Sequence, residues 1–182
     1  MRVMLDACVL YPTVMREVLL GCAQQGLFEA RWSERILEEW ARAAGKLGPA
    51  QEVWARGEIA TLAAKFPKAS VRYAAELEQR YWLPDAADIH VLTAAVVGSC
   101  DGILTMNAKD FPKNLLGDEA LLRWDPDGFA LLLLADAPEQ VRGVANTVLA
   151  EANRLSEQPW TMRALMKKAR MPRLGKALEA SG

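Results

Sequence analysis

The alternation of short apolar runs with segments of helical periodicity is the feature that most limits the fold of this chain. Residues 3–5, 28–32 and 103–106 form brief, largely apolar runs of the length that favours strands. Between these runs, apolar side chains recur at helical spacing. Because strands that alternate with helices usually pair in parallel, the pattern predicts an α/β/α fold of three layers with a central parallel sheet.

Capping and turn residues mark where the helices between these strands begin and end. Pro12 suits the start of the first helix and Gly26 its end, while Ser33 is a good N-cap for the next helix. Either Asp85 or Asp88 can begin the apolar helix that precedes the third strand. Further helical segments are expected over residues 53–66 and 73–81.

The last third of the chain has a different pattern, because helical periodicity continues there without strands. Apolar residues repeat in this way over residues 129–134, 141–155 and 160–169. We therefore expect an α/β domain over residues 1–125 and a C-terminal helical extension over residues 126–182.

Length, net charge and the distribution of apolar residues limit the size of the domain, its binding partners and its location. The chain has 182 residues, which favours one domain with a small appendage, and its net charge is −1. With that charge, binding to a nucleic acid requires a local basic surface. No apolar run is long enough to span a bilayer, and the N-terminus lacks the layout of a signal peptide. We expect a cytoplasmic protein without a membrane segment.

The few cysteines and the single histidine exclude several kinds of site. Cys8, Cys22 and Cys100 are too few and too scattered for a disulfide framework or a zinc site, and are expected to act as small buried apolar residues. His90 is the only histidine, so a metal site with several histidines is excluded.

Acidic residues stand at positions where an ordinary fold has little use for them. Asp6 follows the first strand, Asp88 begins a very apolar helix, and Asp110 lies in the loop after the third strand. Glu38 and Glu39 flank the apolar stripe of another helix, and the sequence leaves the choice between them open. Carboxyl ends of parallel strands and helix N-termini meet at one edge of a sheet, so these carboxylates are expected to converge.

Converging carboxylates repel one another, which raises their pKa values unless a cation is present. Ligands that are all oxygen suit Mg²⁺ or Mn²⁺, and such a site favours hydrolysis of phosphodiester bonds. Simpler roles also exist: Asp6 as a turn residue, Asp88 as a helix cap and Asp110 as a loop residue. Asp85 is the better N-cap, which leaves Asp88 available for the site.

Four segments resemble, in order and spacing, the motifs of PIN domains of the VapC toxin class. The segments are LDACVLYP (residues 5–12), RWSERILEEWAR (31–42), LPDAADIHVLTAAV (83–96) and DGILTMNAKDFP (101–112). The resemblance covers about residues 1–125 and implies that the acids of the site are Asp6, Glu39, Asp88 and Asp110, with Glu38 as a substitute for Glu39. It also implies supporting roles for Thr105 and Asn107.

One residue departs from the family pattern: Cys8 stands where PIN domains usually have Asn or a hydroxyl residue. The resemblance implies a ribonuclease that depends on Mg²⁺ or Mn²⁺, acts as a toxin, forms a homodimer and is inhibited by an antitoxin. A thiol is a weak hydrogen-bond partner, which leaves open a weakly active PIN scaffold that binds protein or nucleic acid.

Two other classes also place acids in this way. A structure-specific DNA nuclease of the flap-endonuclease group usually carries more acids and helical DNA-binding insertions. A receiver-like phosphoacceptor domain needs an acidic pair near the N-terminus, and that pair is missing.

Basic residues crowd the C-terminal segment. They are Arg163, Lys167, Lys168, Arg170, Arg173 and Lys176, and no acid follows until Glu179. Such a segment is either an RNA-binding arm, which gains affinity by releasing counterions, or a solvated helix face. Arg16, in the helix after Asp6, is a further candidate for a phosphate contact or a surface residue.

Overall fold

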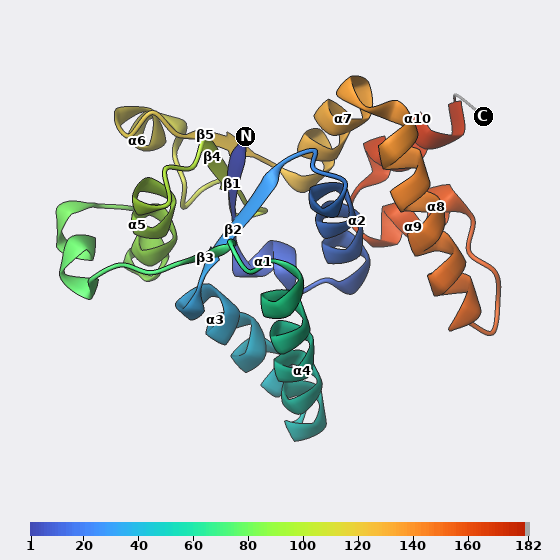
Figure 1. Ribbon diagram of the computed structural model, residues 1–182, viewed down its shortest axis with the longest axis horizontal. Coiled ribbons are helices and arrows are strands. Elements are labelled where there is room, and N and C mark those ends of the chain that lie inside the picture. The colour runs from blue at the N-terminus through green and yellow to red at the C-terminus, as the bar shows by residue number, and fades with distance from the viewer. Residues whose placement is uncertain (181–182) are drawn as a thin grey trace. The chain divides into compact units, whose positions relative to one another are not determined.

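The computed structural model describes residues 1–180 of the chain, which divides into two compact units (Figure 1). The first unit consists of Met1–Tyr11 and Glu29–Trp124. The second consists of Pro12–Phe28 and the chain from Asp125 onward. Residues 12–28 therefore belong to the same unit as the C-terminal helices, although they lie between two strands of the sheet in the sequence.

The first unit is built on a five-stranded sheet in which every pair of neighbouring strands is parallel. The strand order is β3-β2-β1-β4-β5. The strands are β1 (Arg2–Leu5), β2 (Glu29–Ser33), β3 (Ser70–Val71), β4 (Gly102–Leu104) and β5 (Leu122–Trp124). Helices surround this sheet, so the α/β class predicted from the sequence is confirmed.

Strand β1 lies at the centre of the sheet and anchors its core. Val3 is in register with Ala30 of β2 on one side and with Gly102 of β4 on the other. Val3, Met4 and Leu5 are fully buried. Gly102 allows close packing, because a Cβ atom there would lie 2.4 Å from the Trp124 ring and 2.5 Å from the Leu122 carbonyl oxygen.

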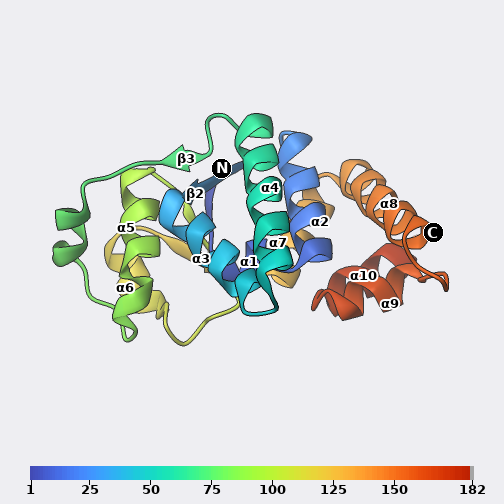
Figure 2. The same cartoon turned by 90° about the horizontal axis from the view of Figure 1, so that it is seen from below.

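Seven helical segments of the first unit surround these strands. They are α1 (Ala7–Leu10), α3 (Glu34–Gly45), α4 (Pro49–Lys65), the 3₁₀ turns η1 (Ala75–Arg80) and η2 (Ala86–Asp88), α5 (Ile89–Val97) and α6 (Lys113–Asp118). Ser33 begins α3 as its N-cap, since its hydroxyl accepts the backbone N–H of Ile36 at 3.3 Å. Helices α3 and α4 pack side by side, and α5 packs against β1, β2 and β4 (Figure 2).

The structure differs from the sequence-based prediction in several elements, which include the short helices α1 and α6 that the pattern did not indicate. Strands β3 and β5 were not predicted, and they contain only two and three residues. The helix expected over residues 73–81 is reduced to the 3₁₀ turn η1, which has no buried residue. Without an apolar face to bury, that segment has little to stabilise a longer helix.

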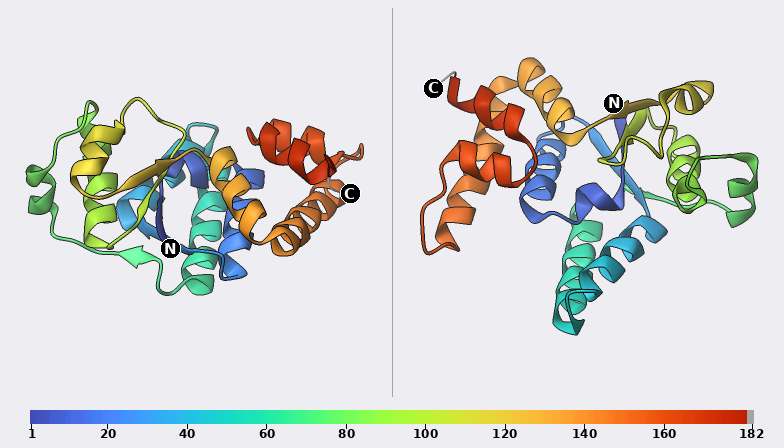
Figure 3. Two further views of the ribbon diagram at one scale, coloured as in Figure 1. Left: turned by 90° about the horizontal axis from the view of Figure 1, so that it is seen from above. Right: turned by 180° about the vertical axis from the view of Figure 1, so that it is seen from behind.

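The second unit is entirely helical within the part of the chain that the structure describes. Its helices are α2 (Thr13–Gln24), α7 (Pro126–Asp136), α8 (Pro138–Arg154), α9 (Met162–Lys168) and α10 (Pro172–Ala180). The C-terminal helices are coloured orange to red in Figure 3. Gly21 permits a close approach of α2 to α8, because a Cβ atom at this position would lie 2.5 Å from a methyl group of Val144. None of the helices in residues 1–180 is long and apolar enough to cross a membrane.

A buried carboxylate joins the last helix to α7. Asp127 is 6% exposed and accepts hydrogen bonds from the backbone N–H groups of Arg173 and Leu174 at 3.0 and 2.8 Å. The guanidinium of Arg173 donates to the same carboxylate at 3.1 Å and to Asp125 at 2.7 Å. Asp127 thus satisfies N–H groups in the first turn of α10, where a negative charge also favours the helix dipole.

Candidate active site

The candidate site lies at the carboxyl edge of the sheet, where the strand order changes direction. From β1 the chain leads to β2 and β3 on one side, and it then crosses to β4 and β5 on the other. Ligands of open α/β sheets bind in the crevice at such a switch point. Asp6 follows β1 at this point and Thr105 follows β4.

Asp6 is held in one orientation by its two neighbours. It is 6% exposed, and its Oδ2 atom accepts a hydrogen bond from the Thr105 hydroxyl at 2.6 Å and one from the Cys8 thiol at 3.0 Å. Thr105 in turn accepts the backbone N–H of Asn107 at 2.9 Å. A carboxylate tied at one oxygen in this way keeps its other oxygen, Oδ1, in a defined position.

Cys8 takes part in this network as a protonated thiol. Burial and the charge of Asp6 raise the pKa of Cys8 to about 12. The thiol therefore stays protonated at neutral pH and donates to Asp6, while its sulfur accepts the backbone N–H of Met106 at 3.3 Å. The residue that departs from the family pattern thus still makes a hydrogen bond to the first acid.

Three further carboxylates converge beside Asp6. One oxygen each of Asp85, Asp88 and Asp110 lies within 4.8 Å of the others. Burial and the negative charges of Asp6, Asp85 and Asp110 raise the pKa of Asp88 to about 6. Asn107 also contacts Asp88, because its side-chain amide donates a hydrogen bond of 3.4 Å to Oδ2.

The donor set fits a hard divalent cation. Its candidate ligands are carboxylate oxygens, as Mg²⁺ and Mn²⁺ prefer, and no histidine or cysteine belongs to the cluster found in residues 1–180. Burial is the main cause of the raised pKa of Asp88, and repulsion by the negative charges of Asp6, Asp85 and Asp110 raises it further. A bound cation removes that repulsion, so Asp85, Asp88 and Asp110, with Asp6 beside them, are the residues that would hold it.

Of the two glutamates, Glu39 is the one that faces helix α5. Its Oε1 atom lies 2.8 Å from Nε2 of His90, which is fully buried and only two residues beyond Asp88. The contact is close, but the ring N–H is poorly aligned for a hydrogen bond, and neither nitrogen of His90 has another partner in residues 1–180. Glu39 also lies 3.8 Å from Arg35.

Glu38 is paired instead with two arginines, Arg42 of α3 and Arg56 of α4. Arg42 and Arg56 each contact it at 2.9 Å, and these hydrogen bonds lower the pKa of Glu38 to about 2. The structure thus separates the pair that the sequence left open: Glu39 points to α5, and Glu38 forms surface ion pairs.

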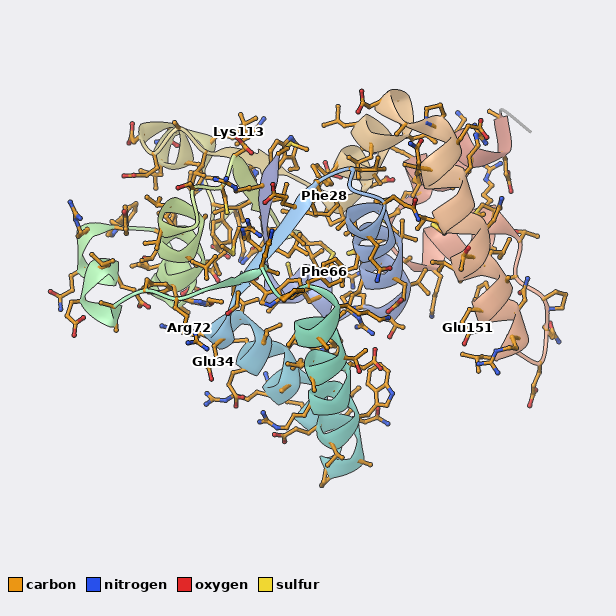
Figure 4. The ribbon with its side chains drawn as sticks, in the orientation of Figure 1. Phe28, Glu34, Phe66, Arg72, Lys113 and Glu151 are labelled. Carbon is orange, nitrogen blue, oxygen red and sulfur yellow. The ribbon has the colours of Figure 1, made fainter. Side chains whose placement is uncertain are left out.

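A groove of about 900 Å³ extends from Glu39 along the same edge of the sheet. Figure 4 labels Glu34 and Arg72, two residues of its wall that follow β2 and β3. Further residues line it: Arg35, Glu38, Arg42 and Tyr73. The Tyr73 hydroxyl lies 2.8 Å from Glu78 and 3.2 Å from the backbone carbonyl of His90, which joins the groove wall to the first turn of α5.

The basic residues considered for RNA binding fall into two groups. Arg16 is fully buried, and therefore is not the surface residue that the sequence suggested, while Arg173 is occupied by Asp125 and Asp127. Lys167, Lys168 and Arg170 are exposed and form no ion pair within residues 1–180.

Asp85 is the acid whose place in the cluster the sequence did not indicate. As expected, it caps the turn η2 by accepting the backbone N–H of Ala87 at 2.9 Å, yet its carboxylate also lies with Asp88 and Asp110. The spacing was a usable signal, since residues three apart share one face of a helical turn.

Comparison with known proteins agrees with this geometry. A family model described as a PIN domain matches residues 2–109, which is more than half of the chain and includes the acids from Asp6 to Asp88. Searches of curated proteins and of solved structures give no significant match. The extent of the family match shows that the chain belongs to the PIN domain family.

Proposed function

We propose that this chain is a metal-dependent endoribonuclease that hydrolyses phosphodiester bonds of RNA, with residues 1–125 as its nuclease domain. PIN domains are generally nucleases. The observation that carries the proposal is the convergence of carboxylate oxygens of Asp85, Asp88 and Asp110 within 4.8 Å of one another, beside the buried Asp6. Placing these carboxylates together has an electrostatic cost, since the charges of Asp6, Asp85 and Asp110 add to burial in raising the pKa of Asp88.

Each acid has a role that follows from its contacts. Asp6 is oriented by Thr105 and Cys8 through Oδ2, and Oδ1 accepts no side-chain hydrogen bond from residues 1–180. Asp88 and Asp110 supply oxygens to the cluster with Asp85, and Glu39 contacts His90 of α5. A bound Mg²⁺ or Mn²⁺ would supply positive charge to the phosphate in the transition state.

We further infer that the nuclease is the toxin of a toxin–antitoxin pair, acts in the cytoplasm and forms a homodimer. The support for these inferences is the resemblance of the four motifs to the VapC class. Expression of the chain alone should stop cell growth, and a small protein encoded immediately upstream should restore it. Growth at the normal rate despite stable expression of the active nuclease would reject the toxin role.

The central test is incubation of the purified chain with total RNA, with and without Mn²⁺. We expect cleavage with Mn²⁺ and none in EDTA. Asp6→Asn should reduce the rate by at least about 100-fold, because it removes the charge of a buried carboxylate that Thr105 and Cys8 hold in one orientation. Glu151→Gln is the matched control, since it also neutralises one acid but breaks only a surface ion pair with Arg154. Full activity in EDTA, or equal losses in the two variants, would reject the mechanism.

A further inference from the structure

Trp82 exposes a large aromatic surface in the first unit. Trp82 is 68% exposed, although the burial of an indole is among the most favourable burials of any side chain. A single exposed apolar side chain is common, so exposure by itself identifies no site. What distinguishes Trp82 is its position in the fold.

Trp82 lies directly before the acidic cluster. The segment that contains it joins η1 to η2, and only two residues separate Trp82 from Asp85. Three peptide units span at most about 11 Å, so the Cα atoms of Trp82 and Asp85 cannot be farther apart than this. An indole at that distance can contact a nucleotide whose phosphate is held at the acids.

The chain is anchored on both sides of Trp82. Leu83 is buried, 2% exposed, and the ring of Pro84 restricts its backbone. Tyr81 has an extended backbone, with φ −120° and ψ 156°. On the other side, η1 is tied down where Glu78 accepts from Tyr73 at 2.8 Å and pairs with Arg35 at 3.2 Å. Such anchoring reduces the entropy lost when a ligand binds.

Exposed arginines of the same unit suit the binding of a nucleic-acid strand. Arg80, two residues earlier, and Arg72, on the groove beside Glu39, are exposed and form no ion pair within residues 1–180. A stacking aromatic ring with cationic side chains that follow the backbone is the combination by which proteins bind single strands. The acidic cluster, once it holds a cation, adds a site for one phosphate of the strand.

We propose that Trp82 stacks on a base of single-stranded RNA next to the phosphate that is cleaved. The proposal rests on the nuclease function for the identity of the strand. Trp82 is expected to contribute to affinity for nucleotides with any base, because every base offers a face for stacking.

The test compares two 12-nucleotide RNAs that carry fluorescein, one with all its bases and one with abasic positions through its centre. Both are titrated against the Asp6→Asn variant, which should bind without cleaving. We expect the complete RNA to bind about 10-fold more tightly. Adding Trp82→Leu should remove this difference, whereas Trp82→Phe should keep most of it. Trp54→Leu is the control, because Trp54 is also exposed, 48%, but lies on α4.

Two binding results and one change in oligomeric state would overturn the proposal. If Trp82→Leu still prefers the complete RNA, or if the Asp6→Asn parent has no preference, Trp82 is not a stacking site. If Trp82→Leu alters only the oligomeric state, measured by light scattering, the indole belongs to a protein interface. Failure of the wild-type chain to cleave RNA would reject the nuclease function alone, because the binding comparison does not depend on cleavage.

Discussion

Thr105 Oγ1 lies 2.6 Å from Asp6 Oδ2, a hydrogen bond between residues 99 positions apart in the sequence. It links the ends of β4 and β1 at the point where the strand order changes direction. Both residues are buried, at 2% and 6% exposure, so water competes little with this bond. The orientation of Asp6 thus depends on a residue that follows β4, a strand about 100 positions later in the sequence.

Replacement of Thr105 by Val should therefore weaken the site without changing its shape. A hydrogen bond to a charged group contributes about 1.5–3 kcal/mol, so we expect Mn²⁺ affinity and cleavage to fall by about 10-fold to 100-fold. Thr105→Ser keeps the hydroxyl and should retain most activity. Calorimetric titration with Mn²⁺ measures the effect, and equal affinities for the Val and Ser variants would contradict the role of this bond.

The thiol of Cys8 supplies the second hydrogen bond to Asp6, and its protonated form is the donor. Cys8→Ser replaces the thiol with a better donor and should bind Mn²⁺ at least as tightly as the parent. Cys8→Ala removes the donor and should lower affinity by several fold. Cys22→Ala, at a buried cysteine far from this network in the sequence, serves as the control for lost packing. Weaker binding by the Ser variant than by the Ala variant would contradict this prediction.

The raised pKa of Asp88 predicts how the metal-free protein responds to pH. In the unfolded chain an aspartate ionises near pH 4, whereas in the folded protein Asp88 ionises at about 6. Between these values the folded state binds more protons than the unfolded state, so stability falls as pH rises. Asp88→Asn should remove this contribution and be more stable than the parent above pH 6, with the difference disappearing near pH 4. Urea unfolding in EDTA across this range measures it.

A divalent ion should reverse the order of stability of the parent and Asp88→Asn. Added Mn²⁺ neutralises the repulsion in the parent and should raise its melting temperature at pH 7.5, because the ion binds the folded state only. Asp88→Asn has one ligand fewer and should gain less. An equal gain in both proteins would show that Asp88 does not hold the ion.

The sequence predicted the parallel sheet and the convergence of distant acids for the same physical reason. Carboxyl ends of parallel strands must meet at one edge, and a charge directly after a buried strand has to lie at that edge. Asp6 and the loop of Asp110 could therefore be placed without any knowledge of side-chain contacts. The two- and three-residue strands β3 and β5 could not be predicted, since so few residues show no periodicity.

The residue pattern alone could not choose between Glu38 and Glu39, although the family resemblance favoured Glu39, because the choice depends on residues remote from both. Adjacent positions flank the same apolar stripe, and local pattern treats them alike. In the structure Glu38 accepts a hydrogen bond from Arg56 of α4, and Glu39 contacts His90 of α5. The burial of Arg16 was hidden in the same way, because a charged residue on an amphipathic helix is usually exposed.

The basic residues on and after α9 lead to a last prediction, about affinity rather than chemistry. Lys167, Lys168 and Arg170 are exposed, while Arg173 is engaged by Asp125 and Asp127. If the three exposed residues bind phosphates, their replacement by Glu should weaken RNA binding. The slope of log affinity against log salt should also fall by about 0.7 for each phosphate that is no longer bound. Truncation is a poorer test, because α9 and α10 bury apolar side chains such as Leu165 and Leu174.

A control with the same change in net charge separates a local interaction from a general electrostatic effect. Lys46, Lys65 and Lys68 are exposed residues of the first unit, and their replacement by Glu also changes the charge by six. At physiological salt an exposed charge acts over only about 8 Å. If the residues near α9 contact the phosphates directly, this control variant should therefore leave the salt slope nearly unchanged. If the two triple variants lower affinity and slope equally, the residues near α9 are a solvated helix face and not an RNA-binding surface.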